Sequence, residues 1–260
     1  MSDVIRIFVG SSANGEDAEA EAVLSWSIKK HCSRPYEVTW MRQSRDPASF
    51  WHGWDCRQWG TPFSAFRFGI PEYCGFQGKA IYTDVDVWFQ DDPANLWDQA
   101  VPEGKIALAK GNGSWRLCVS LWDCAAAQGI VPSVAELRAG ASSYLISEDM
   151  KSRSLMSAFS GNWNCLDGEQ YAYVDDPRIK ALHYTDMETQ VHLPYALPRL
   201  EAAGRQHWYT GTRKPHPRAD VQDRFDELLA EATAAGEGAD QFIPAELFGP
   251  YPRGPFELQD

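Results

Sequence analysis

The sequence is poor in basic residues and lacks long apolar runs. It holds 24 Lys and Arg against 36 Asp and Glu, a formal net charge of −12, which repels phosphate backbones and anionic lipid headgroups. Nucleic acids and membrane surfaces are therefore not expected as partners. No stretch approaches the roughly 20 apolar residues that span a bilayer, and the beginning of the sequence has no basic segment followed by an apolar signal core. We expect a cytoplasmic protein without a membrane span.

Paired cysteines, internal repeats and low-complexity linkers are also absent. The six cysteines are scattered without a Cys-x-x-Cys pair, so we expect reduced, mostly buried thiols and no zinc site. A chain of 260 residues that is 44% hydrophobic suits a single α/β domain with a large core. We expect this domain over residues 1–235, followed by an extended arm, residues 236–260, packed on the same domain.

The first part of the chain carries the pattern of a βαβ unit. Residues 4–9 are a β-branched run that predicts a buried strand ending at Gly10. Residues 16–31 have apolar positions at three- and four-residue spacing, with acids first and lysines last, and predict a helix. Residues 36–41 predict a second strand. A parallel sheet with a right-handed crossover is therefore expected.

The rest of the chain gives more scattered signals. Residues 44–61 have no sustained period and predict a long loop of the kind that carries function. Its tryptophans, Trp51, Trp54 and Trp59, are expected in the core in preference to a sugar-stacking role. Further strands are predicted over 79–83, 105–110, 117–122 and 179–184, and further helices over 61–73, 92–97, 133–139, 149–159 and 218–235.

Two carboxylates separated by one residue follow the strand predicted over 79–83. Asp84 and Asp86 flank Val85, and in an extended chain their side chains share a face, with Cα atoms ~6 to 7 Å apart. Both can therefore approach one cation. The carboxyl end of a parallel strand is also where open α/β sheets place their ligands. A divalent cation here would reverse the field that the acidic chain presents to an anionic substrate.

The acid pair and its surroundings resemble family 8 glycosyltransferases. Asp91-Asp92-Pro93-Ala-Asn-Leu96-Trp97 continues the motif as in that family, where a strand, the acidic pair, a short strand and a turn into Leu-Trp follow in order. Upstream, the run from Thr61 to Glu72 resembles the family's helix with an arginine and an Ile-Pro-Glu end. The resemblance extends from Ile5 to about Tyr184. It implies the GT-A fold, a single Rossmann-like α/β domain with a mainly parallel central sheet flanked by helices.

The resemblance also implies a nucleotide-sugar site. Gly10, Ser11 and Ser12 stand where the family's first strand delivers loop backbone to the base and ribose of the donor. Asp84 and Val85 belong to the motif that binds the donor. Arg67 is implied as a donor contact, to phosphate or to the acid pair, and an ordinary surface position is the alternative.

The metal ligands implied by the resemblance are Asp84, Asp86 and His183. Leu182-His183-Tyr184-Thr185 resembles the family's late His-Phe/Tyr segment, whose histidine is the third protein ligand. A core histidine is the competing interpretation of His183. Two carboxylates, one imidazole and two diphosphate oxygens suit Mn²⁺, with Mg²⁺ as competitor.

The sequence departs from the family at two places. The lysine that follows the family's histidine and binds the diphosphate is missing, and either Arg213 or Lys214 is a candidate substitute, with a basic surface loop as the alternative. The family's Asp-Gln pair near the sugar has no clear counterpart. The catalytic candidates in that region are Asp149, Asp167 and Gln170, beside Glu148, and each is also interpretable as a surface residue or helix cap.

The implied activity is a metal-dependent, retaining glycosyltransferase, a hexosyltransferase that uses a nucleotide-sugar donor. UDP is the family's usual nucleotide, and the acceptor is a glycan, a lipid-linked sugar or a small molecule. The sequence defines no oligomeric state. One alternative is a haloacid-dehalogenase-like phosphatase, although its Asp-x-Asp strand normally opens the fold. The other is a non-catalytic GT-A scaffold that binds a nucleotide sugar or glycan, which the missing lysine and Asp-Gln pair favour.

Overall fold

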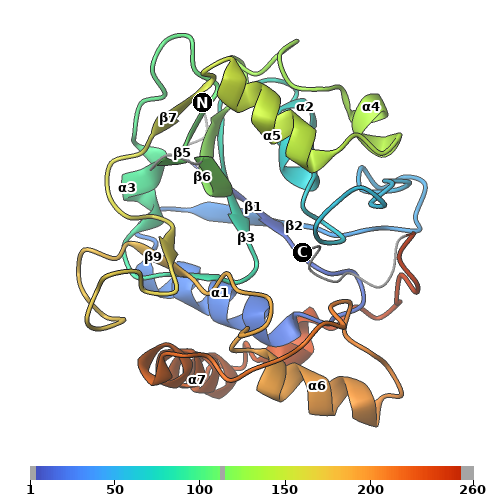
Figure 1. The fold of residues 1–260 in the computed structure, drawn as a ribbon, viewed down its shortest axis with the longest axis vertical. Coiled ribbons are helices and arrows are strands. Elements are labelled where there is room, and N and C mark those ends of the chain that lie inside the picture. Colours follow the sequence, from blue (N-terminus) through green and yellow to red (C-terminus); the bar gives the residue numbers. More distant parts are fainter. Residues whose placement is uncertain (1–3, 112–114, 253–260) are drawn as a thin grey trace.

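A six-stranded sheet forms the centre of the molecule, in the order β2-β1-β3-β6-β5-β7 (Figure 1). The computed structural model describes residues 4–111 and 115–252. Only β6 runs antiparallel to its neighbours, β3 and β5, and the other pairs are parallel. The expected α/β domain with a mainly parallel sheet is confirmed. The strands are β1 (Ile5–Gly10), β2 (Tyr36–Met41), β3 (Lys79–Asp84), β5 (Ala107–Gly111), β6 (Trp115–Asp123) and β7 (Met156–Ala158).

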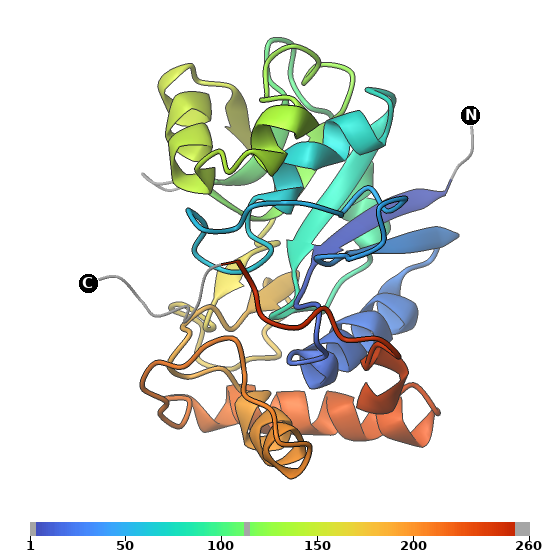
Figure 2. The same ribbon diagram turned by 90° about the vertical axis from the view of Figure 1, so that its right-hand side faces the viewer.

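Helices cover both faces of this sheet. α1 and α7 lie on one side, and α2 and α5 lie on the other (Figures 1 and 2). α1 carries acids in its first turn and Lys29, Lys30 and His31 in its last, which complements its dipole. None of the helices in the described residues is long and apolar enough to cross a membrane. The helices are α1 (Ala18–His31), α2 (Ile70–Tyr73), α3 (Pro93–Trp97), α4 (Val134–Arg138), α5 (Ser143–Ser152), α6 (Leu193–Ala202) and α7 (Ala219–Ala234).

A second, three-stranded sheet continues from the end of β3. It has the order β4-β9-β8, from β4 (Val87–Phe89), β8 (Cys165–Leu166) and β9 (Ala181–His183). β4 and β9 are antiparallel, with Val87 opposite His183. The acid pair therefore stands where the chain passes from the large sheet to the small one.

Two predicted helices are wrong in part. Residues 61–65 form turns, and only a 3₁₀ helix, Phe66–Gly69, and the short α2 follow. The aromatic rings of Phe63 and Phe66 are buried here, so packing decides the backbone in place of helix propensity. The helix expected over 149–159 is also displaced. α5 begins after Ser142 and ends at Ser152, and residues 156–158 form β7, because they pair with β5.

The long loop and the end of the chain both pack against the domain. Trp51, Trp54 and Trp59 of the loop are buried, as expected. After α7, a 3₁₀ helix, Ala239–Phe242, interrupts the expected extended arm. The arm then crosses beside the loop that joins β1 to α1 (Figure 2), where the backbone N–H of Ala13 donates to the Tyr251 hydroxyl at 2.8 Å. The division into residues 1–235 and 236–260 stays a prediction.

Candidate active site

Asp84 is the last residue of β3, an interior strand of the large sheet. Its pairing partner is Gly10, the last residue of β1, so the two parallel strands end side by side. One oxygen of Asp84 accepts from the Arg67 guanidinium at 3.0 Å and from the Tyr82 hydroxyl. Burial alone would lower the pKa of Arg67, but Asp84, together with Tyr82 and Cys118, raises it more, so its pKa lies above the ordinary value. Arg67 is therefore buried and contacts the acid pair, one of the alternatives left open for it, and its role as a donor contact stays a prediction.

Asp86 lies beside His183 because of the strand register in the small sheet. With Val87 opposite His183, the histidine Nε2 stands 3.2 Å from Asp86 Oδ1. The Gln190 amide donates to the other Asp86 oxygen at 2.7 Å. Burial alone would raise the pKa of Asp86 and lower that of His183, but their attraction reverses both shifts, so the pKa of Asp86 is lowered and that of His183 raised.

The second nitrogen of His183 decides what its Nε2 can bind. His183 Nδ1 lies 2.9 Å from the Asn164 amide oxygen, which only accepts, so Nδ1 carries a hydrogen. In the charged ring Nε2–H donates to the Asp86 carboxylate, and in the neutral ring Nε2 presents a lone pair that a metal ion shared with Asp86 can accept. A histidine that donates its other N–H to an oxygen acceptor is the common arrangement of a metal ligand.

The donor set therefore fits a divalent cation. Asp84, Cys118 and His183 have potential ligand atoms within 4.8 Å of one another, and Asp86 faces the same imidazole. Carboxylate oxygens and an imidazole nitrogen suit Mn²⁺ or Mg²⁺. The residues expected to hold the metal are thus together in space, although neither the ion nor its identity is given by this geometry.

The cavity beside the acid pair is small. It has a volume of about 50 Å³, whereas ligand pockets commonly measure roughly 300 to 1,000 Å³. A nucleotide sugar fits only if part of the lining moves. The lining residues are Asp17, Thr61, Phe63, Arg67, Asp84, Val85, Asp86, Met187, Gln190 and Trp208.

The remaining donor-site candidates are placed differently. Ser11 and Ser12 are each 1% exposed, so neither offers free surface to a nucleotide in this conformation. Val85 is buried and lines the acid-pair cavity. Lys214 pairs with Glu188 and lines a neighbouring cavity of about 440 Å³ that shares Gln190 with the first.

Only one of the three catalytic candidates lies beside the metal candidates. Asp167 follows β8, and its N–H donates to the His183 carbonyl at 2.9 Å. The Asp149 side chain is 55% exposed on α5 and pairs with Arg153, and Gln170 is exposed in a turn. Neither Asp149 nor Gln170 lines the acid-pair cavity. Their catalytic roles stay predictions.

Three site residues escaped sequence reasoning. Asn164 orients His183, Gln190 holds Asp86, and Asp17 lines the cavity from the start of α1. Each is a single polar residue without a periodic signal. The available sequence signal was the departure from the family 8 pattern, because Asn164 and Gln190 lie in the segments where that departure occurs.

Comparison with known proteins identifies the fold. No protein-family model matches the chain, and no curated protein matches it. Solved glycosyltransferases share its structure at low identity. The apo structure of the bifunctional glycosyltransferase WbbM superposes with a TM-score of 0.56 at 11% identity, over 89% of this chain and 50% of WbbM.

Two further structures agree. GlyE of Streptococcus pneumoniae TIGR4 has a TM-score of 0.55 at 14% identity, over 95% of this chain and 67% of GlyE. The galactosyltransferase LgtC, in complex with donor and acceptor sugar analogues, has a TM-score of 0.53 at 12% identity, over 88% of this chain and 96% of LgtC. This chain thus spans half of WbbM but nearly all of LgtC. The α/β domain described above has the GT-A glycosyltransferase fold.

Proposed function

We propose that the chain is a metal-dependent glycosyltransferase of the family 8 type, with a nucleotide-sugar donor, most simply a UDP-sugar, bound beside Asp84 and Asp86. The observation that carries the proposal is the His183 ring, whose Nε2 stands 3.2 Å from Asp86 while Nδ1 donates to Asn164. A proton on Nε2 or a metal ion in its place satisfies that contact, and a GT-A fold with a metal ion at its acid pair is suited to bind a diphosphate.

The chain's own residues would share the work of binding and activating the donor. Asp84, Asp86 and His183 would hold Mn²⁺ or Mg²⁺, which when bound stabilises the negative charge that grows on the departing diphosphate. Arg67, already paired with Asp84 at 3.0 Å, fixes that carboxylate and adds positive charge at the edge of the cavity. Gln190 keeps Asp86 in place through its 2.7 Å hydrogen bond.

The neighbouring cavity supplies room that the acid-pair cavity lacks. Its volume is about 440 Å³, and it begins at Gln190, the residue that contacts Asp86. Arg213 and Lys214 line it beside the half-exposed ring of Tyr195. We propose that it accommodates the acceptor, a glycan, lipid-linked sugar or small molecule. Retention of anomeric configuration and a role for Asp167 belong to this proposal.

A non-catalytic nucleotide-sugar scaffold is the second candidate. It is favoured by the pairing of Lys214 with Glu188 and by the exposure of Asp149 and Gln170, neither of which lines the acid-pair cavity. The two candidates differ in turnover. A scaffold binds donor without hydrolysing or transferring it.

Isothermal titration of UDP into the protein, with Mn²⁺ or with EDTA, tests the proposal. We expect metal-dependent binding that weakens by at least about tenfold in Asp86→Asn, because a cation ligand and its charge are lost. Asp91→Asn is the matched control. Asp91 lies five residues further along and pairs with Lys180 at 2.7 Å, so its loss should leave UDP binding unchanged.

The titration is followed by incubation with a panel of UDP-sugars. Release of UDP would support the enzyme, and binding without release for any donor or acceptor would support the scaffold. If neither UDP nor another nucleotide binds in either buffer, the donor site and both candidates are wrong.

A further inference from the structure

Two segments after β9 close the acid-pair cavity. Residues 187–192 contribute Met187 and Gln190 to its lining, and residues 207–209 contribute Trp208. We call these two segments the cover. Gln190 reaches Asp86 at 2.7 Å, and the ring of Trp208 packs edge-on against Phe63 at 5.8 Å. With only about 50 Å³ left beneath it, the cover has to move before a nucleotide can reach the metal candidates.

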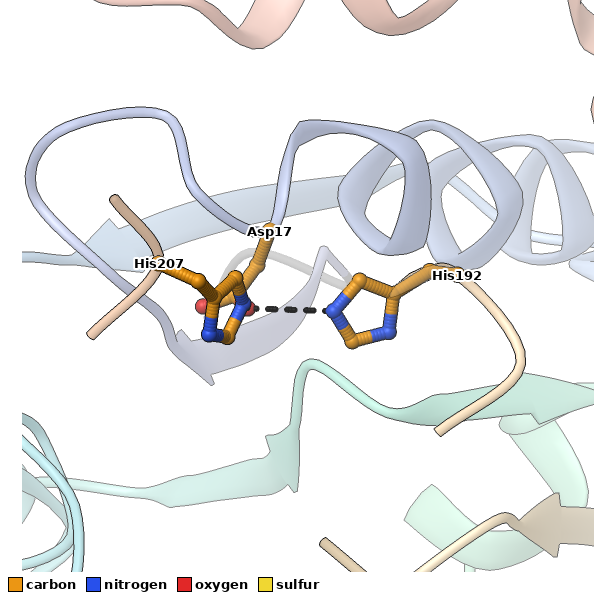
Figure 3. A group of neighbouring side chains, drawn as sticks. All are labelled: Asp17, His192 and His207. Carbon is orange, nitrogen blue, oxygen red and sulfur yellow. Dashed lines mark hydrogen bonds and ion pairs between the residues drawn. The ribbon is translucent and has the colours of Figure 1, made fainter. Parts of the chain in front are cut away.

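A single buried carboxylate meets both segments of the cover. Asp17 is 1% exposed and stands 3.2 Å from His207 Nε2 and 3.0 Å from Trp208 Nε1 in the second segment. In the first segment, His192 Nε2 lies 3.4 Å away. Figure 3 shows both imidazole rings beside the Asp17 carboxylate. Within the described residues neither nitrogen of the buried His192 ring makes a hydrogen bond, so its approach to Asp17 is an ion-pair contact.

Asp17 is itself fixed to the loop that follows β1. The N–H of Ser12 donates to the Asp17 carboxylate at 3.3 Å, and the N–H of Asp17 donates to the Ser12 hydroxyl at 3.2 Å. This reciprocal pair joins the proposed nucleotide loop to the start of α1. Asp17 also lines the acid-pair cavity, so it links the loop after β1 to the cover.

The ring nitrogens show that this cluster is built for hydrogen bonds and not for a second metal ion. The three side chains are close enough for a metal, with potential ligand atoms within 4.8 Å. However, the N–H of Tyr209 donates to His207 Nδ1 at 3.0 Å, so Nε2 carries the hydrogen and directs it at Asp17. Nδ1 of His183 has the opposite role, as a donor. His207 cannot bind a cation through Nε2 without losing the Tyr209 bond.

The carboxylate keeps its charge in this position. Burial alone would raise the pKa of Asp17, but the bonds to His192 and His207 lower it more, so its pKa lies below the ordinary value. A buried anion depends on its donors, and hydrogen bonds to a charged group are stronger than those between neutral groups. The cover is therefore held by charge-assisted bonds that must break before it lifts.

We propose that Asp17 is a positioning residue of the donor site, which latches both segments of the cover over the acid pair. The inference rests on the proposed function and adds a gate to it. Nucleotide enters when the bonds to Asp17 open and is retained when they form again. Weakening the latch should accelerate both entry and release.

Asp17→Asn tests the latch in two measurements. The amide keeps the shape of the side chain but turns an NH₂ group toward the donors of His207 or Trp208. Without ligand, we expect amide hydrogen exchange in residues 187–192 and 207–209 to be at least about tenfold faster than in the wild type. With Mn²⁺ present, stopped-flow binding of UDP should show faster association and at least about tenfold faster dissociation.

Glu21→Gln is the matched control. Glu21 is a second buried carboxyl of α1, and its ion pair with Arg42 at 2.7 Å lies outside the cover, so amide exchange in residues 187–192 and 207–209 should not change. Trp208→Phe serves if Asp17→Asn does not fold, because it removes one donor to Asp17 and keeps a ring in the cavity. It should shift both measurements in the same direction by a smaller factor.

Wild-type exchange and wild-type UDP rates in both Asp17→Asn and Trp208→Phe would overturn the proposal. If no nucleotide binds even the wild type, the proposed function fails, and the role of Asp17 in donor binding fails with it. The exchange measurement still separates the two failures, since it needs no ligand.

Discussion

Of the histidines that face carboxylates, His183 and His207 differ at their second ring nitrogen, and this gives them different chemistry. His183 donates from Nδ1 to Asn164, which leaves a lone pair for a cation beside Asp86. His207 accepts at Nδ1 from the Tyr209 N–H, which leaves a hydrogen for Asp17. In the sequence both are histidines followed by an aromatic residue. The two histidines differ in the partner of Nδ1, an acceptor oxygen for His183 and a donor N–H for His207. Only the folded structure shows which partner each has.

The free energy of unfolding of the metal-free protein should depend on pH through His183. Its pKa in the folded state is raised above 6.5, because attraction to Asp86 outweighs burial. A raised pKa stabilises the fold below the unfolded-state value, and that stabilisation is lost as the pH rises through the folded-state pKa. In EDTA, the melting temperature of the wild type should therefore exceed that of His183→Gln most at about pH 6, and the difference should shrink toward about pH 9.

Mn²⁺ should reverse this trend, because a metal binds the neutral imidazole and competes with the proton. The stabilisation that Mn²⁺ gives the wild type should grow as the pH rises, and His183→Gln should show little of it. A melting-temperature difference that stays constant over the whole pH range would contradict the raised pKa.

At the scale of elements, the sequence predicted the helices and strands that have their own periodicity or capping residues. β1, α1 and β2 follow residue periodicity, and α3 begins at Asp92 and Pro93, where the Asp92 side chain accepts from the Ala94 N–H. β7 has no such pattern, because it becomes a strand only by pairing with β5. α6 was not predicted, since its prolines, among them Pro198 inside the helix, hide its period.

The candidate site divides in the same way. The acid pair and Arg67 stand out in the sequence because a strand and a short motif surround them. In the sequence, Gln190 lies 104 residues from its partner Asp86, and Asp17 lies 190 residues from its partner His207. Only the fold brings these residues together. Sequence reasoning thus found the ligands of the proposed cation and missed the residues that hold those ligands and cover them.

The packing of α7 should support the metal site through one aromatic contact. Phe225 is fully buried and packs edge-on against Tyr184, the residue after His183, with ring centroids 5.8 Å apart. Phe225→Ala removes a large buried ring and should lower the free energy of unfolding by about 3 to 5 kcal/mol. Urea denaturation followed by circular dichroism measures this loss.

Leu247→Ala is the comparison for this variant. Leu247 is 41% exposed, so its truncation should change the free energy of unfolding by less than about 0.5 kcal/mol. A loss below about 1 kcal/mol for Phe225→Ala would mean that α7 does not pack against Tyr184 as described. If Phe225→Ala lowers the free energy of unfolding as expected but leaves the Mn²⁺ affinity unchanged, the contact with Tyr184 stabilises the fold without supporting the metal site.

At the scale of the whole molecule, the negative net charge of the chain repels the proposed anionic ligand, UDP. The formal net charge is −12, and UDP is an anion, so the long-range field slows its approach. The cationic groups near the cavities are largely paired, as in Arg67 with Asp84 and Lys214 with Glu188. Local attraction therefore depends on the metal ion, which acts only at short range.

This balance makes the salt dependence of association informative. Raising the ionic strength from about 0.01 M to 0.15 M shortens the Debye length from about 30 Å to 8 Å, which screens the repulsion before UDP reaches the cavity. The association rate of UDP in saturating Mn²⁺ should therefore rise with salt, and that of the neutral nucleoside uridine should stay constant. A rate for UDP that falls with salt would show that Arg67, Arg213 and Lys214 present a positive field at the entrance, and the metal ion would then not be the only source of attraction.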